Sequence, residues 1–383
     1  MAVEASGVSA DPHLEDRHRE LALRVRELGE RNLRAVARDE EDPRRRAAEI
    51  AALLAQADLL RPAVPPPVGT MDARSLLVAR EGLAYFSLLA ESVLAAQALA
   101  AHPIAAAGTD AQRGRWLPAL ASGSVTGALA ATEPEAGSDL GAVRTQAEKD
   151  GSLYRLSGVK AWVTAAKGAG LFVVLGRTSA EEGPRGLALF LVDGGAPGLA
   201  TRPLEAMAAL PLCELRLDAV PAVLLGEAGG GLRLVQRALE TLRPGAAGAA
   251  CGLAARALEE AVRHALTRRQ YGRPLAGFQA TKMSLADMHA ELAAARCLAR
   301  HAAWLLDTDA KDGPREAAAA RLVAGETAGR VADRALQLHG ARGLVRGSTV
   351  ERLYREARAL RLREGTSEGL RLELAEEILK ENR

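Results

Sequence analysis

The segment LRLREGTSE (360–368) holds the residue types with the clearest chemical use. It places the carboxylate of Glu364 against Gly365, with hydroxyl groups on Thr366 and Ser367 directly beyond. A glycine beside a carboxylate lets the backbone approach a ligand closely, and two hydroxyls can hydrogen-bond a polar cofactor. Because Glu-Gly-Thr also occurs in ordinary loops, the meaning of this segment depends on the other segments of the chain.

Two segments in the first half of the chain have residues suited to a flat, polar ligand. In ALAATEPEAGSDL (128–140), a threonine and a serine bracket a turn whose N–H groups and hydroxyls can face a heterocycle or a phosphate. In GVKAWVTAA (158–166), Trp162 and Thr164 alternate along a strand and share one face, which suits a planar ring. An ordinary polar turn and a buried core tryptophan are the alternatives.

Two later segments have the character of a phosphate or nucleotide contact. In RRQYGRPLAGFQATKMSLADM (268–288), Arg268 and Arg269 precede a turn that contains glycine and proline. The planar fork of arginine matches phosphate oxygens, although a surface salt-bridge patch is the alternative. The segment LQLHGARG (336–343) reads as a helix end followed by glycines, which predicts a loop that faces a ligand.

Composition excludes several functional classes. The chain has 383 residues, enough for two or three domains or one large unit, and its net charge of +2 shows neither a nucleic-acid footprint nor an acidic tail. No run is expected to reach the roughly 18 apolar residues of a membrane span. The start, MAVEASGVSADPHLED, lacks the basic and apolar parts of a secretion signal. Three distant cysteines without metal-ligand spacing indicate buried thiols in a reducing, cytoplasmic compartment.

The elements that must position these segments follow from hydrophobic periodicity. Three- and four-residue spacing predicts helices in 14–60, 73–101 and 110–120, with a proline-rich break at 61–69. Short runs of valine, leucine and phenylalanine predict strands at 154–164, 171–178, 187–193 and 212–220. Helical periodicity returns at Gly231 and continues to the end, with breaks near 271–277, 307–314 and 340–349.

The last helices are rich in alanine, as in 317–336, and small residues permit close helix packing. Such a bundle either only holds the chain together or also forms the core of an oligomer. The predicted layout is a helical part (1–123), a β part (124–230) and a second helical part (231–383).

These segments, with GTDAQRGRWLPALASG (108–123) and VERLYREARALRLREGTSE (350–368), resemble the acyl-CoA dehydrogenase family of flavoproteins. Six segments occur in the order and spacing of that family. The resemblance implies an α+β multidomain fold, with an N-terminal helical domain, a middle β-barrel or sandwich domain and a C-terminal four-helix bundle. It also implies bound FAD, a homotetramer or dimer, and an electron-transfer flavoprotein as the electron acceptor.

The resemblance assigns further positions to ligand contacts. Thr132 would hydrogen-bond the isoalloxazine ring, Ser138 a cofactor phosphate or the thioester tail, and the Thr164 hydroxyl would lie near flavin N5. The full set implied for the cofactor is Leu129, Ala131, Thr132, Gly137, Ser138, Trp162, Val163, Thr164, Arg268, Gln270, Tyr271, Gln337, Leu338, Gly340, Ala341, Thr366 and Glu368. The set implied for the substrate is Ser138, Glu240, Arg243, Arg363 and Gly365.

The resemblance implies that Glu364 is the catalytic base. It would remove the α-proton of an acyl thioester while hydride passes from the β-carbon to flavin N5. The enolate-like oxygen would be stabilised by a flavin ribityl hydroxyl and by the backbone N–H of the base. We expect burial to raise the pKa of this glutamate and so make it a better base.

The chain departs from the family pattern at several places. Arg363 precedes the base where an aromatic residue is frequent, Ala341 replaces a frequent second glycine, and segments 62–72 and 204–220 differ from relatives. FAD binding is expected to survive these changes. The acyl group and its carrier, coenzyme A or an acyl carrier protein, are left open. Oxidation of a hydroxyacyl group, or γ,δ-desaturation of an enoyl thioester in a natural-product pathway, is a further hypothesis.

Two functions other than a dehydrogenase are weighed against the same residues. A flavin monooxygenase on the same fold is disfavoured by Glu364, because oxygenating relatives commonly lack this base. A non-catalytic assembly partner is disfavoured by the six retained segments, because it would need no cofactor contacts.

Overall fold

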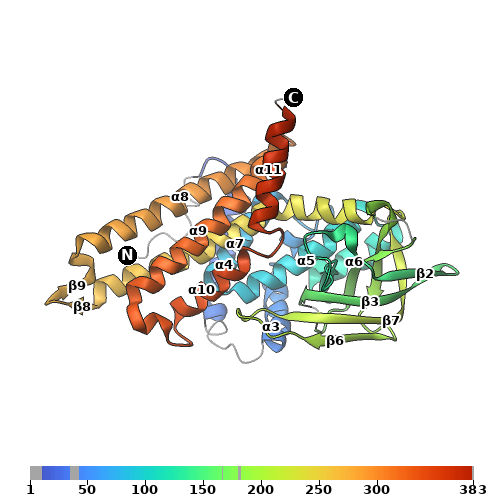
Figure 1. Ribbon diagram of the computed structural model, residues 1–383, viewed down its shortest axis with the longest axis horizontal. Coiled ribbons are helices and arrows are strands. Elements are labelled where there is room, and N and C mark those ends of the chain that lie inside the picture. The colour runs from blue at the N-terminus through green and yellow to red at the C-terminus, as the bar shows by residue number, and fades with distance from the viewer. Residues whose placement is uncertain (1–10, 35–42, 166, 180–182, 382–383) are drawn as a thin grey trace. The chain divides into compact units, whose positions relative to one another are not determined.

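The computed structural model describes residues 11–34, 43–165, 167–179 and 183–381 (Figure 1). Its contacts divide the chain into two compact units. The helical unit comprises Met1–Glu40, Ala73–Leu88 and Arg243–Arg383, and the sheet unit comprises Glu41–Asp72 and Leu89–Leu242.

The helical unit is a bundle in which α8 packs against α9, and α9 packs against α10 and α11. In Figure 1, α8 and α9 run side by side. Helix α4 packs against both α1 and α8. The elements are α1 (Asp16–Leu28), the π-helical turn η1 (Gly29–Leu33), α4 (Ala73–Phe86), most of α7 (Gly231–Thr267), β8 (Arg269–Gln270), β9 (Arg273–Pro274), η5 (Leu275–Gly277), α8 (Gln279–Asp307), α9 (Gly313–His339), η6 (Gly340–Leu344), α10 (Thr349–Leu360) and α11 (Ser367–Glu381).

Three glycines let α7 approach α4 closely. A Cβ atom added at Gly248 would lie 2.5 Å from the carbonyl oxygen of Leu77, and one at Gly252 would lie 2.0 Å from that of Glu81. At Gly245 it would meet the Arg80 side chain at 2.8 Å. Any larger residue would push the helices apart, so these glycines fix the position of α4.

The sheet unit combines helices with seven strands. Its elements are α3 (Pro43–Gln56), η2 (Arg61–Ala63), α5 (Leu88–Ala107), α6 (Asp110–Ser122), β1 (Gly127–Ala130), η3 (Leu140–Ala142), β2 (Gln146–Asp150), β3 (Leu153–Thr164), β4 (Leu171–Arg177), η4 (Pro184–Gly186), β5 (Leu187–Asp193), β6 (Leu199–Pro203) and β7 (Leu212–Leu225).

The strand pairings close on themselves. β4 pairs with β5, β5 with β7, β7 with β3, and β3 with β2, while β2 returns to β4 through the single pairing of Gln146 with Arg177. β1 adds to β4 in parallel, and β6 adds to β7. This closure confirms the expected barrel-like β domain and leaves few strand edges unpaired.

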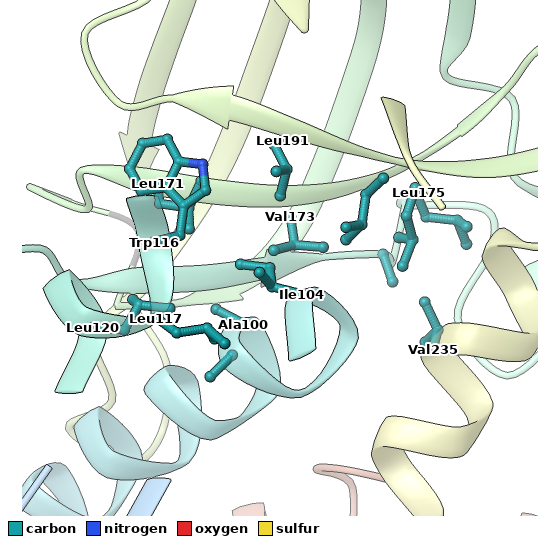
Figure 2. Close-up of a cluster of buried hydrophobic side chains, with 14 of the residues drawn as sticks. Ala100, Ile104, Trp116, Leu117, Leu120, Leu171, Val173, Leu175, Leu191 and Val235 are labelled. Carbon is teal, nitrogen blue, oxygen red and sulfur yellow. The ribbon is translucent and has the colours of Figure 1, made fainter. Parts of the chain in front are cut away.

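Both faces of β4 are buried, which explains its nearly continuous apolar sequence. Leu171, Val173 and Leu175 join a cluster with helix residues such as Ile104 and Trp116 (Figure 2). The alternate residues of β4 enter a second cluster inside the sheet, with Phe190, Leu215 and Leu217 among others.

Helix α5 corrects one expectation. An 18-residue window of this 20-residue helix has a mean hydropathy of 1.3, so by length and composition the helix meets the test for a membrane span that no run was expected to meet. Of the window that meets the test, 83% is buried in the structure, which is the behaviour of a core helix.

Candidate functional site

The loop between α10 and α11 carries the candidate base in an unusual backbone conformation. Glu364 has φ +54° and the following Gly365 has φ +104°. A residue with a side chain pays a steric penalty in the left-handed region, so surrounding contacts must hold Glu364 there.

The carboxylate of Glu364 accepts two hydrogen bonds from Arg80 of α4. The two Nη atoms of Arg80 donate to the two carboxylate oxygens at 2.8 and 2.7 Å. The side chains of Arg80 and Glu364 are only 1% and 7% exposed. Such a fork of two charge-assisted hydrogen bonds fixes direction as well as charge.

Two further arginines support the same loop. Arg321 of α9 is buried, and its Nη2 donates to the carbonyl oxygens of Leu360 and, at 2.8 Å, Arg363. The Arg363 Nη2 atom lies 3.5 Å from a carboxylate oxygen of Glu364. Within the described residues, the backbone N–H of Glu364 donates no hydrogen bond, so it can serve a ligand oxygen.

The expected rise in the pKa of Glu364 is wrong. Burial raises the pKa of this carboxyl, but the charges of Arg80, Arg363 and Arg321 and the Arg80 hydrogen bonds outweigh burial. The pKa of Glu364 therefore lies well below its ordinary value. No sequence motif connects Arg80 with Glu364, because 284 residues separate the two.

In the sheet unit, Trp162 stands out on β3. Its side chain is 52% exposed although Val163 and Ala161 beside it are buried. A register shift between Lys160 and Val163 and a φ of +52° at Trp162 turn this ring outward. Val163 is buried and Thr164 is half-buried, and the shared face of Trp162 and Thr164 stays a prediction because the strand is irregular at Trp162.

A buried ion pair holds the 128–140 turn against this strand. Lys160 Nζ donates to Glu133 at 2.8 Å and to the carbonyl oxygen of Ala131 at 3.1 Å. The Ala161 N–H donates to the carbonyl oxygen of Thr132 at 2.9 Å. The two segments expected along the flavin therefore lie side by side, with Trp162 exposed next to the turn.

The charges of this pair are strongly perturbed. Burial lowers the pKa of Lys160 to about 8 despite the carboxylate of Glu133. Burial also opposes the charge on Glu133, but Lys160, Thr145 and the Arg144 N–H together hold its pKa below the ordinary value. Each charge thus depends on its partner.

We expect Lys160→Met to destabilise the protein by about 3 kcal/mol, because it leaves Glu133 charged and buried. The loosened turn should also release flavin during dialysis. Urea unfolding and the flavin content per chain measure both effects, and Lys149→Met on exposed β2 is the control. Full flavin retention by Lys160→Met would show that the pair does not position the turn.

The predicted nucleotide segments meet at one end of the helical unit. The rings of His264, near the end of α7, and His339, at the end of α9, stack with centroids 4.1 Å apart. This contact brings the β8–β9 hairpin near the 336–343 segment. Burial lowers the pKa of His264, as do the neighbouring positive charges of Arg268 and Arg342, so this end of the unit favours an anion.

The hairpin itself projects from the bundle (Figure 1). Tyr271 at its tip is 94% exposed, and Gln270 is exposed beside it. The remaining predicted contacts in this part, Gln337, Leu338, Gly340 and Ala341, are exposed or half-buried at the end of α9 and in η6.

Arg243 has a partner that the sequence did not indicate. Both its Nη atoms donate to Glu373 of α11 at 2.6 Å. Its proposed contact with the acyl-CoA, and that of half-buried Glu240, stay predictions. Thr366 caps α11 by accepting the Gly369 N–H at 3.1 Å, while Glu368 is exposed.

The sequence analysis missed four buried charged residues that contact the predicted site segments: Arg80, Arg321, Glu133 and Lys160. A signal existed for Arg80, since Leu76, Leu77 and Leu83 surround it at helical spacing and place it on an apolar face. A charge on such a face needs a buried partner.

Three family models match nearly the whole chain: the acyl-CoA dehydrogenase N-terminal domain at residues 15–124, the middle domain at 128–220 and the C-terminal domain at 229–379. The chain belongs to the acyl-CoA dehydrogenase family and has its three-domain fold. It is an oxidoreductase of the kind that acts on CH–CH donors.

Curated relatives and solved structures match over similar lengths. A 3-(aryl)acrylate reductase from Clostridium sporogenes is 32% identical over 374 residues, 95% of this chain and 99% of the relative. The caffeyl-CoA reductase–Etf complex subunit CarC from Acetobacterium woodii is 33% identical over 81% of this chain and 83% of that protein. The structure of butyryl-CoA dehydrogenase from Megasphaera elsdenii superposes with a TM-score of 0.90 at 29% identity, covering 96% and 100% of the two chains.

The cofactor of this family is FAD, and residues of this chain fit it. The exposed face of Trp162 suits the flavin ring. Gly137 and Gly340 lie open, because an added Cβ atom would meet nothing within 4 Å, so a ligand can approach the backbone there. Arg268 and Arg342 place positive charge beside His264, and positive charge of this kind would suit a diphosphate.

Proposed function

We propose that this protein oxidises an acyl thioester with Glu364 as the base. The observation that carries the proposal is a buried carboxylate at the matching position, oriented by two hydrogen bonds from Arg80 and with its own N–H available. A carboxylate in this state can accept a proton without first losing one.

The proton step breaks the α C–H bond and forms an O–H bond on Glu364. The electron pair moves toward the thioester carbonyl, whose oxygen gains negative charge. The Glu364 N–H stabilises that charge by donating a hydrogen bond. FAD, when bound, supplies the acceptor for the β-hydride.

The finer assignments are proposals that draw on relatives. A subunit named for its complex with Etf supports an electron-transfer flavoprotein as the partner of this chain. The names caffeyl-CoA reductase and butyryl-CoA dehydrogenase support a coenzyme A thioester, whereas a similar structure named a prolyl acyl carrier protein oxidase supports a carrier-bound one. We also propose a homo-oligomer, a cytoplasmic location, and Thr132, Thr164 and Arg268 as cofactor contacts.

A second candidate is deprotonation further along the chain, at the γ-carbon of an enoyl thioester. It is favoured by Arg363, whose Nη2 lies 3.5 Å from the carboxylate of Glu364. The depressed pKa of Glu364 makes it a weak base, and conjugation with the thioester makes a γ-proton more acidic than an unconjugated C–H.

The test is the anaerobic flavin spectrum of the purified holoenzyme with a set of thioesters. Butyryl-CoA and 3-phenylpropionyl-CoA probe α,β-oxidation. 2-Hexenoyl-CoA, which has both a γ-proton and a δ-hydride to lose, probes γ,δ-desaturation, and the same acyl groups on an acyl carrier protein probe the carrier. Bleaching by a saturated CoA thioester supports the leading proposal. Bleaching only by carrier conjugates would shift the substrate class, and reaction only with oxygen would contradict a dehydrogenase.

We expect Trp162→Ala to weaken flavin binding by roughly fivefold, because it removes an aromatic stacking contact that contributes about 1 kcal/mol. Trp162→Phe should retain most of the affinity. Quenching of tryptophan fluorescence by added FAD measures the dissociation constant, with Trp304→Ala as the control. Equal affinity in Trp162→Ala and the wild type would remove Trp162 from the flavin site.

A further inference from the structure

We propose that Arg80 is a positioning residue for the base, whose guanidinium fork sets the direction of the Glu364 carboxylate and shares its charge until the substrate proton arrives. This inference rests on the proposed function of Glu364. It assigns a role in proton transfer to a residue of α4, far in sequence from the base loop.

Contacts hold both the carboxylate of Glu364 and the backbone of its loop. Arg80 holds the carboxylate at 2.8 and 2.7 Å, and Arg321 holds the loop backbone through the carbonyl oxygens of Leu360 and Arg363. Arg80 itself cannot retreat, because Gly245 and its neighbours on α7 pack directly against α4. The left-handed backbone of Glu364 is therefore maintained from two helices.

The fork leaves the carboxylate able to react. Each carboxylate oxygen has two lone pairs, and Arg80 engages one on each oxygen. The substrate proton must use a remaining lone pair or displace one Arg80 hydrogen bond. The direction of approach is thus restricted, which is how a positioning residue acts on a rate.

Arg80 also sets the pH range over which the carboxylate of Glu364 is charged. The charged groups that face Glu364 among the described residues are Arg80 from α4, Arg321 from α9 and Arg363 from its own loop. When Glu364 takes a proton it becomes neutral and leaves the Arg80 cation buried without that counter-charge, which is unfavourable. When Arg80 is lost, the effect of burial on the pKa of Glu364 is no longer outweighed by the Arg80 charge. The pKa of Glu364 should therefore rise toward neutral pH.

The experiment isolates the proton step in the holoenzyme. The probe is 3-thiahexanoyl-CoA, which has α-protons but sulfur at the β position, so it has no β-hydride to transfer. Exchange of its α-protons for deuterium in D₂O is measured by mass spectrometry across pH. The infrared carboxyl band that disappears in Glu364→Gln reports protonation of the base directly.

The variants are Arg80→Lys, which keeps the charge but loses the fork, and Arg80→Gln, which loses both. Arg74→Lys is the matched control, because Arg74 is also buried on α4 and donates to a carboxylate, that of Asp307, at 2.7 Å. The control should match the wild type in pH dependence.

We expect Arg80→Lys to slow exchange by about tenfold and Arg80→Gln by about 10²-fold in the acid range. The wild type should show no acid limb over mildly acidic pH, and Arg80→Gln should gain one. An unchanged pH dependence and infrared band in folded Arg80→Lys and Arg80→Gln would overturn the role of Arg80. If Arg80→Gln does not fold, the rate and infrared band of Arg80→Lys alone decide. Exchange that persists in Glu364→Gln would instead contradict the proposed function itself.

Discussion

Replacement of Glu364 by glutamine is expected to slow flavin reduction by an acyl thioester by about 10⁴-fold. The amide keeps the size of the side chain but cannot accept the α-proton. Stopped-flow absorbance of the flavin under anaerobic conditions gives the rate.

The control for that experiment is Glu376→Gln, which removes an exposed carboxylate of α11 that belongs to no predicted ligand contact. It should reduce its flavin at the wild-type rate. Both variants should retain flavin and helical circular dichroism. A Glu364→Gln protein that bleaches within tenfold of the wild type would mean that another group is the base.

The second large effect concerns stability. We expect Arg80→Met to lower the free energy of unfolding by about 3–5 kcal/mol, because it leaves the Glu364 carboxylate buried without its partner. Glu364→Leu should lower the free energy of unfolding by a similar amount, because it removes the carboxylate that pairs with buried Arg80. The double variant should recover much of the loss, since neither charge is then buried. Urea unfolding of the four proteins completes the cycle.

The pH dependence of this cycle has a defined sign. The pKa of Glu364 is lower in the folded state than its ordinary value of 4.5. The contribution of the pair is therefore fully present above pH 4.5 and is lost as the pH falls toward the folded-state pKa. The double variant lacks this dependence. Single-variant losses that simply add in the double variant would show that the pair is not coupled.

The sequence predicted the elements that have a strong apolar pattern. Strands β4 and β5 were found because both of their faces are buried and their residues are almost all apolar. Strands β2 and β6 were missed, because their burial patterns are largely exposed and their sequences are polar. The four-residue β1, GALA, is too short to show a period.

The residues of the candidate site also fall into a group that the sequence predicted and a group that it did not. Glu364 and Trp162 could be found because they lie inside contiguous motifs. The partner of Arg80 and the pairing of Lys160 with Glu133 could not be found, because tertiary packing brings these residues together. The pKa of Glu364 was mispredicted for this reason, since burial was inferred without the arginines that accompany it.

The most direct test of the account is deuterium incorporation at the α-carbon of a bound acyl thioester. The wild-type holoenzyme is incubated in D₂O with butyryl-CoA or 3-phenylpropionyl-CoA and no electron acceptor, and the recovered thioester is analysed by mass spectrometry. We predict incorporation at the α-carbon by the wild type and none above background by Glu364→Gln. Equal incorporation by both proteins would contradict Glu364 as the base.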